Sequence, residues 1–111
     1  MTGIFRKIIA VDFDGCICTN NWPDIGNPNW VVINKLKREQ ELGSAIILWT
    51  CRGGEPLQSA VKFCKELGLE FDAINENLPE QIRAWGRDSR KISADEYWDD
   101  LAVNTTLFKE D

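Results

Sequence analysis

The chain contains no histidine, and this absence restricts both acid–base chemistry and metal binding. Histidine is the side chain that most readily exchanges a proton near neutral pH, so proton transfer must fall to carboxylates, Cys, Lys or Tyr. The four cysteines include no Cys-x-x-Cys pair, so a zinc site is not expected. Cys16 and Cys18 flank a single residue and are expected to be reduced side chains that pack in the interior.

Long apolar runs and an excess of basic residues are also missing. The longest apolar runs, 8–11 and 45–49, fall far short of the roughly 18 residues that a membrane span requires. Thirteen basic and eighteen acidic residues give a net charge of −5, the wrong sign for nonspecific binding to nucleic acid or anionic lipid. The short apolar stretch at the N-terminus runs directly into Asp12 and is not typical of a secretory signal. We therefore expect a cytoplasmic protein without membrane or nonspecific nucleic-acid partners.

The length of 111 residues predicts a single domain, residues 1–111. A hydrophobic fraction of 43% and five tryptophans exclude a disordered chain. A domain of this size buries enough surface to fold without a disulfide scaffold or a structural metal.

Strands and helices alternate in the sequence pattern. In chain order we predict a strand at 7–13, a loop at 20–29, a helix from an Asn27-Pro28 cap to Gly43, a strand at 45–49, a helix from Pro56 to Gly68, a strand at 71–74, a helical turn at 79–85 and a strand at 97–98. This alternation indicates an α/β fold: a doubly wound, Rossmann-like, mainly parallel sheet with helices on both faces.

Polar residues stand at the carboxyl ends of three of these strands. They are Asp12 and Asp14 at the end of the first, Thr50 after the second, and Asp99 and Asp100 after the last. Ligands of open parallel sheets bind beyond the carboxyl ends of the strands, so these side chains are expected to converge.

The converging residues suit the transfer of a phosphoryl group. Asp12 and Asp14 are one residue apart, and two such close carboxylates repel each other unless a cation lies between them. Together with Asp99 and Asp100 they form an all-oxygen ligand set of the kind that Mg²⁺ prefers. Thr50 adds a hydroxyl and Lys91 a positive charge, while Arg52 fits either a substrate phosphate or a structural ion pair.

Four segments, in this order, carry a resemblance to a known family. They are IIAVDFDG at 8–15, AIILWT ending at Thr50, Lys91 in SRKISAD, and EYWDD ending at Asp99-Asp100. This set resembles the four motifs of the haloacid dehalogenase-like superfamily of phosphohydrolases. The resemblance covers residues 8–100, most of the chain.

The resemblance implies a Mg²⁺-dependent phosphatase that acts on a phosphorylated small molecule. Asp12 would be the nucleophile that forms an aspartyl-phosphate, and Asp14 would protonate the leaving group and then activate water. Mg²⁺ would be held by the Asp12 carboxylate, the Asp14 backbone carbonyl and Asp99, with Asp100 close by. Thr50 and Lys91 would bind the phosphoryl oxygens.

The sequence departs from the family in three places. Cys16 stands where the family usually has Thr, Leu101-Ala102 stands where small relatives often have Arg-Asn, and only eleven residues follow Asp100. No segment is long enough for a cap domain, so we expect a capless enzyme with an open site. Exposed Trp22, Trp30 or Trp85 would line its mouth, and self-association into a homo-oligomer would cover it.

Two other functions are compatible with parts of this pattern. One is an inactive binding or regulatory protein on the same scaffold, which the short C-terminal tail favours and the intact site residues disfavour. The other is a receiver domain with a phosphorylated aspartate. It fits less well, because the phosphoacceptor of a receiver lies at a middle strand, where this chain has Thr50.

Overall fold

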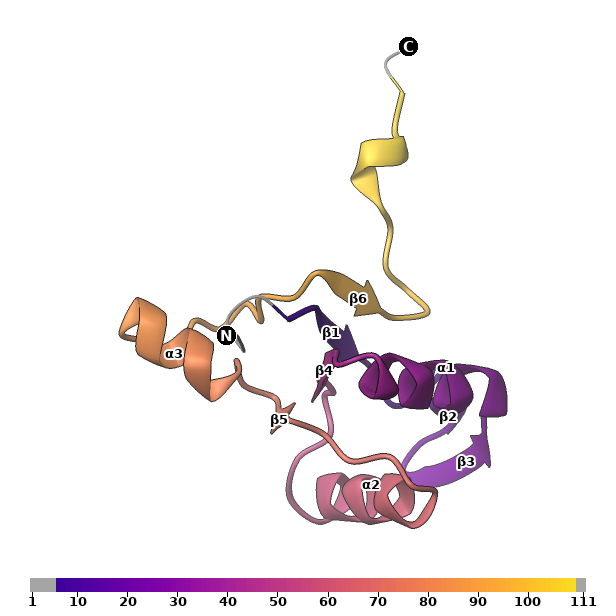
Figure 1. Ribbon diagram of the computed structural model, residues 1–111. Helices are drawn as coiled ribbons and strands as arrows, with labels where there is room; N and C mark the ends of the chain where they lie inside the picture. Colours follow the sequence, from indigo (N-terminus) through magenta and orange to yellow (C-terminus); the bar gives the residue numbers. More distant parts are fainter. Residues whose placement is uncertain (1–5, 110–111) are drawn as a thin grey trace.

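A parallel four-stranded sheet is the centre of the computed structural model, which describes residues 6–109 (Figure 1). Its strands are β1 (Ile8–Val11), β4 (Ala45–Leu48), β5 (Ala73–Ile74) and β6 (Glu96–Trp98), in the order β5-β4-β1-β6. All three pairings are parallel, so the carboxyl ends of the strands lie at one edge. The prediction about a secretory signal rests partly on residues 1–5, which lie outside the described residues.

One face of the sheet is covered by two long helices, α1 (Trp30–Glu41) and α2 (Gly54–Glu66). The buried residues that meet there are Ile9, Val11, Ile46 and Leu48 from the sheet and Ile33, Leu36, Ala60 and Cys64 from the helices. The short apolar, β-branched strands of the sequence are explained by this burial, because β1 and β4 are buried along their whole length.

The opposite face has a thinner cover. Ala10 and Ile47 pack there against Leu78 and Ile92, whereas none of the residues of α3 (Pro79–Trp85) is buried. The chain thus crosses one face twice through α1 and α2 and returns over the other, which confirms the predicted doubly wound, Rossmann-like fold. No cap domain occurs within residues 6–109.

The segment predicted as a loop at 20–29 instead contains most of an antiparallel hairpin, β2 (Cys18–Asn21) and β3 (Asp24–Pro28). Gly26 permits the pairing, because a Cβ atom at this position would overlap the backbone carbonyl of Thr19. The hairpin is largely exposed, so its sequence is polar and lacks the apolar alternation of a half-buried strand.

Both long helices begin elsewhere than predicted. Asn29 rather than Asn27 caps α1, with its Oδ1 accepting a hydrogen bond from the Val32 N–H at 3.4 Å, while Pro28 ends β3. Helix α2 begins at Gly54, before Pro56. Among the described helices, none has the length and apolar character needed to cross a membrane.

The chain after β6 leaves the sheet. Residues 101–109, which include a short 3-10 helix (Thr105–Leu107), are exposed and lead away from the sheet in Figure 1. All four cysteines are free thiols, and Cys16 and Cys18 are buried as predicted.

Candidate active site

The ends of three strands bring the predicted site residues to one edge of the sheet. The Asp12 N–H donates to the Trp98 carbonyl at 2.9 Å, and the Trp49 N–H donates to the Val11 carbonyl at 2.9 Å. These bonds extend the pairing one step beyond the strands themselves. They hold the residues after β1, β4 and β6 side by side.

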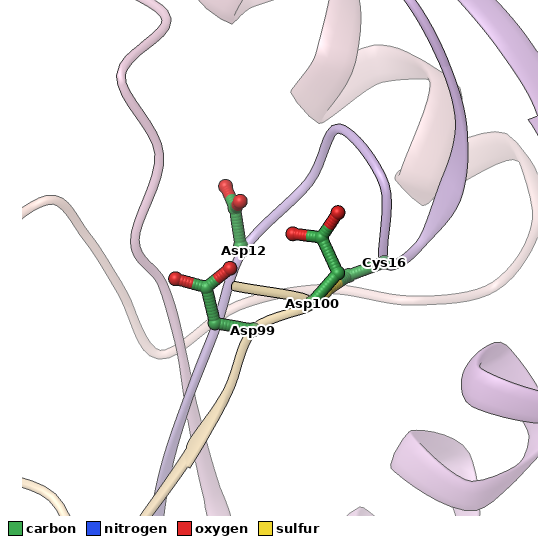
Figure 2. Close-up of side chains that lie close together, drawn as sticks. All are labelled: Asp12, Cys16, Asp99 and Asp100. Carbon is green, nitrogen blue, oxygen red and sulfur yellow. The ribbon is translucent and has the colours of Figure 1, made fainter. Parts of the chain in front are cut away.

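An acidic cluster of Asp12, Asp99 and Asp100 forms at this edge (Figure 2). One carboxylate oxygen from each residue and the Cys16 sulfur all lie within 4.8 Å of one another. Burial raises the pKa of the Asp12 carboxyl above its usual value, and the charges of Asp99, Asp100 and Asp14 raise it further. The hydrogen bond that Asp12 accepts from the Phe13 N–H at 2.7 Å lowers it in part. A divalent cation would relieve this repulsion.

The thiol of Cys16 is the fourth group of this arrangement. Burial raises its pKa to about 11, so it stays protonated, and it donates a weak hydrogen bond to the Trp98 carbonyl at 3.6 Å. The charged ligands of the cluster are therefore carboxylate oxygens, which suit a hard cation such as Mg²⁺ or Ca²⁺. The sequence predicted that Cys16 packs in the interior, but its place beside the carboxylates was missed.

Gly15 allows Asp100 to approach the loop that follows β1. Its φ of +84° lies in the left-handed region, and a Cβ atom there would come within 2.5 Å of an Asp100 carboxylate oxygen. Both the backbone conformation and the space thus require glycine at this position.

Asp14 does not join the acidic cluster, although only one residue separates it from Asp12 in the sequence. Its two carboxylate oxygens accept hydrogen bonds from Arg52, one from Nε at 2.9 Å and one from Nη2 at 2.7 Å. The chain turns immediately after Asp12, since the Ile17 N–H donates to the Phe13 carbonyl at 3.0 Å. The alternation that would align the side chains of Asp12 and Asp14 is therefore lost. The predicted role of Asp14 as a side-chain metal ligand is not supported, and that of its backbone carbonyl stays a prediction.

Arg52 is an internal residue. Only 2% of it is exposed, and its remaining donors reach backbone carbonyls, with Nη1 bonded to Pro23 and Pro56 and Nη2 to Asp24. The guanidinium also lies between two aromatic rings, those of Phe13 and Trp22, each centred 5.0 Å away. With every donor used, Arg52 has none left for a ligand. The structure thus shows the ion pair that the sequence offered as one alternative, and the role of Arg52 in binding a substrate phosphate stays a prediction without a free donor to support it.

Thr50 occupies the position that the sequence predicted, close to the acidic cluster. It lines a hollow of about 230 Å³ together with Asp12, Trp49, Cys51 and Asp99, which we call the first hollow. The Thr50 N–H donates to Asn75 Oδ1 at 2.8 Å, and the Thr50 hydroxyl accepts from the Arg52 N–H at 3.1 Å.

Asn75 is a positioning residue that the sequence reasoning missed. It has a φ of +55° directly after β5, and its side chain fixes the backbone of Thr50. The signal that could have revealed Asn75 is its position, since it is a polar residue directly after the predicted strand at 71–74.

A second hollow of about 290 Å³ adjoins the first, and Cys51 lines both. Its other lining residues are Asp14, Asn20, Trp22 and Arg52. Of the three tryptophans expected at the mouth, Trp22 is 56% exposed here, whereas Trp30 and Trp85 are exposed but line neither hollow.

Lys91 is exposed and lines neither hollow. It borders a larger groove of about 780 Å³ with Asp99 and the start of the tail. Buried Asn77 holds this segment in place: its Nδ2 donates to Asp88 at 2.7 Å, and its Oδ1 accepts from the Ser93 N–H at 2.8 Å. Within residues 6–109, the structure gives the Lys91 side chain no hydrogen bond or ion pair, so its catalytic role stays a prediction.

Comparison with known proteins identifies a relative. The chain is similar to a solved structure described as that of a conserved protein from Bacteroides thetaiotaomicron, with 40% identity and a TM-score of 0.78. The match covers 88% of this chain and 78% of the other. The chain belongs to the family of this Bacteroides protein. No family model and no curated protein matches the chain. The similarity to this family member supports the α/β fold and does not bear on the activity of the chain.

Proposed function

We propose that the chain is a Mg²⁺-dependent phosphohydrolase of the haloacid dehalogenase-like superfamily. It would cleave the phosphomonoester of a small molecule through an aspartyl-phosphate on Asp12. One observation carries this proposal: Asp12 belongs to the acidic cluster and also lines the first hollow with Thr50. A nucleophile, a candidate metal site and a hydroxyl donor thus meet at the carboxyl ends of parallel strands, where such folds bind ligands.

The metal would be held by Asp12, Asp99 and Asp100. The donor set fits Mg²⁺, because these ligands are oxygens and the neighbouring Cys16 thiol is protonated. Bound Mg²⁺ would neutralise the carboxylates and polarise a phosphoryl oxygen.

Asp12 would act first. Its carboxylate oxygen attacks phosphorus, the bond from phosphorus to the ester oxygen breaks, and the departing oxygen takes the proton of Asp14, which would enter this step protonated and with one oxygen released from Arg52. Water then attacks the phosphorus of the aspartyl-phosphate and gives a proton to Asp14, which releases inorganic phosphate and restores Asp12. Asp14 accepts two hydrogen bonds from Arg52, which fix its carboxylate in the lining of the second hollow.

Thr50 is well prepared to hold the phosphoryl group. Its oxygen already accepts a hydrogen bond from the Arg52 N–H, so its own proton is free to point to a phosphoryl oxygen. Lys91 would supply a positive charge from the rim, where it borders a groove together with Asp99.

The proposal extends to the cellular compartment and the oligomeric state of the protein. The four free thiols suit a reducing compartment such as the cytoplasm. The open site and the exposed tryptophans favour a homo-oligomer.

Hydrolysis of p-nitrophenyl phosphate tests this function. We expect sustained product release with Mg²⁺, none with EDTA, and none from Asp12→Asn. Glu66→Gln, which removes an exposed carboxylate on α2, is the matched control and should keep full activity. Release of a single equivalent from the wild type would indicate a receiver-like phosphoacceptor. Absence of any release would favour an inactive binding protein.

A further inference from the structure

We propose that the second hollow binds the organic part of the phosphate ester, and that Trp22 stacks there on a flat aromatic or heterocyclic ring of the substrate. This inference rests on the proposed function, because the two hollows receive their roles from the reaction. It assigns a class of substrate, a phosphate ester that carries a planar ring, which the proposed function alone does not define.

The positions of the two carboxylates divide the substrate between the hollows. Asp12, which would take the phosphoryl group, lines the first hollow, and Asp14, which would protonate the ester oxygen, lines the second. Cys51 lines both, so the two hollows meet at this residue. An ester with its phosphorus at Asp12 and its bridging oxygen toward Asp14 therefore directs its organic group into the second hollow.

Trp22 is held ready for a ligand. The Arg52 guanidinium lies over its ring at 5.0 Å and is itself fixed by five hydrogen-bonding contacts to Asp14 and three backbone carbonyls. The backbone N–H of Trp22 donates to Asn20 Oδ1 at 3.2 Å, which fixes the main chain that carries the ring. One face of the indole is thus covered by a rigid partner, while 56% of the residue stays exposed. Stacking on a ring that is already positioned loses little conformational entropy.

The charges of the hollow favour an uncharged ring over a second anionic group. The positive charge of Arg52 is matched by Asp14, and its donors are all used inside the protein. A second phosphate or a carboxylate would find no free cation among the residues that line the hollow. Its volume of about 290 Å³ lies just below the range for drug-sized ligand pockets, roughly 300–1,000 Å³, which suits a single ring system.

A matched pair of substrates tests this assignment. Adenosine 5′-monophosphate and ribose 5-phosphate present the same type of primary phosphate ester and differ mainly in the flat base. Stacking of a base on an aromatic side chain typically corresponds to a factor of about 10 or more. We expect kcat/KM for the nucleotide to exceed that for the sugar phosphate by about 10-fold. Trp22→Leu should bring the two values close together, Trp22→Phe should keep most of the difference, and the control Trp85→Leu should keep all of it.

A binding measurement gives a second readout that needs no turnover. The measurement uses Asp12→Asn, which should bind the substrate without hydrolysing it. The NMR resonance of the Trp22 indole N–H is assigned by its loss in Trp22→Leu. This resonance should shift with adenosine 5′-monophosphate and not with ribose 5-phosphate. Hydrolysis of p-nitrophenyl phosphate without preference for the nucleotide over the sugar phosphate would overturn the assignment and leave the proposed function intact. Failure of the wild type to hydrolyse p-nitrophenyl phosphate would overturn both.

Discussion

Replacement of Asp12 by asparagine should stabilise the protein when no divalent cation is present. Asp12 lies with Asp99 and Asp100 in the acidic cluster, where oxygens of all three fall within 4.8 Å of one another. The amide removes the charge and keeps an oxygen that can accept the hydrogen bond from the Phe13 N–H. The variant thus relieves repulsion with little change in shape.

The size of this effect follows from Coulomb's law. Two unit charges 4.8 Å apart repel each other by ~1 kcal/mol in water and by ~3.5 kcal/mol at an effective dielectric constant of 20. Asp99 and Asp100 are exposed, so solvent screening places each pair near the lower value. Two such pairs give ~2 kcal/mol, which corresponds to a rise in Tm of ~8 °C for a domain of this size.

The dependence on pH has a defined sign. Burial and the neighbouring charges raise the pKa of Asp12 in the folded protein above its unfolded value, so ionisation at neutral pH opposes folding. The penalty is complete above the folded pKa and disappears as the pH falls below the unfolded value of about 4, where Asp12 is protonated in both states. The advantage of Asp12→Asn should therefore be present at pH 7 and fade in acid.

Thermal melts in EDTA and in excess Mg²⁺ provide the assay. A cation at 100 times its Kd stabilises the wild type by ~2.7 kcal/mol, and this gain should shrink in Asp12→Asn. Glu66→Gln serves as the charge-matched control, without effect in either buffer. The reasoning is refuted if Asp12→Asn melts at or below the wild-type temperature in EDTA, or if Mg²⁺ raises both melting temperatures equally.

Two further predictions concern the surroundings of the cluster. Arg52→Ala should destabilise the protein by ~3–5 kcal/mol in urea unfolding, because it leaves the Asp14 carboxylate without its buried partner. Arg52→Lys should restore part of this loss. An unchanged urea midpoint for Arg52→Ala would contradict the ion pair. Gly15→Ala should reduce the Mg²⁺-induced rise in Tm, because its Cβ would displace Asp100. The control Gly43→Ala shares the positive φ but has open space around the new Cβ, so it should lose only ~1–3 kcal/mol of stability. An equal Mg²⁺ response in both variants would contradict the role given to Gly15.

Much of the fold was predictable from local pattern. The strands at 8–11 and 45–48 are apolar throughout because both of their faces are buried, and this signal depends little on the rest of the chain. The hairpin was missed because its pairing depends on Gly26 and on backbone bonds between exposed polar strands, which leave no apolar periodicity.

The candidate site was predictable where it depends on topology. Parallel strands bring their carboxyl ends together, so the approach of Asp12 to Asp99 and Asp100 followed from their positions after strands. The partner of Asp14 did not follow, because Arg52 lies 38 residues away and reaches it through side-chain packing between Phe13 and Trp22. Sequence patterns fix which residues end a strand, whereas such pairings depend on the packed interior.

The most direct test of the account is the behaviour of Asp14→Asn with p-nitrophenyl phosphate. This leaving group needs little protonation, so Asp12 should still be phosphorylated, while hydrolysis of the intermediate should slow by about 10²–10⁴-fold without Asp14 as the base. We predict a burst of about one equivalent of p-nitrophenolate, a slow steady rate, and one extra phosphoryl mass on the acid-quenched peptide that contains Asp12. Steady turnover with no burst and no phosphorylated peptide would contradict the covalent mechanism.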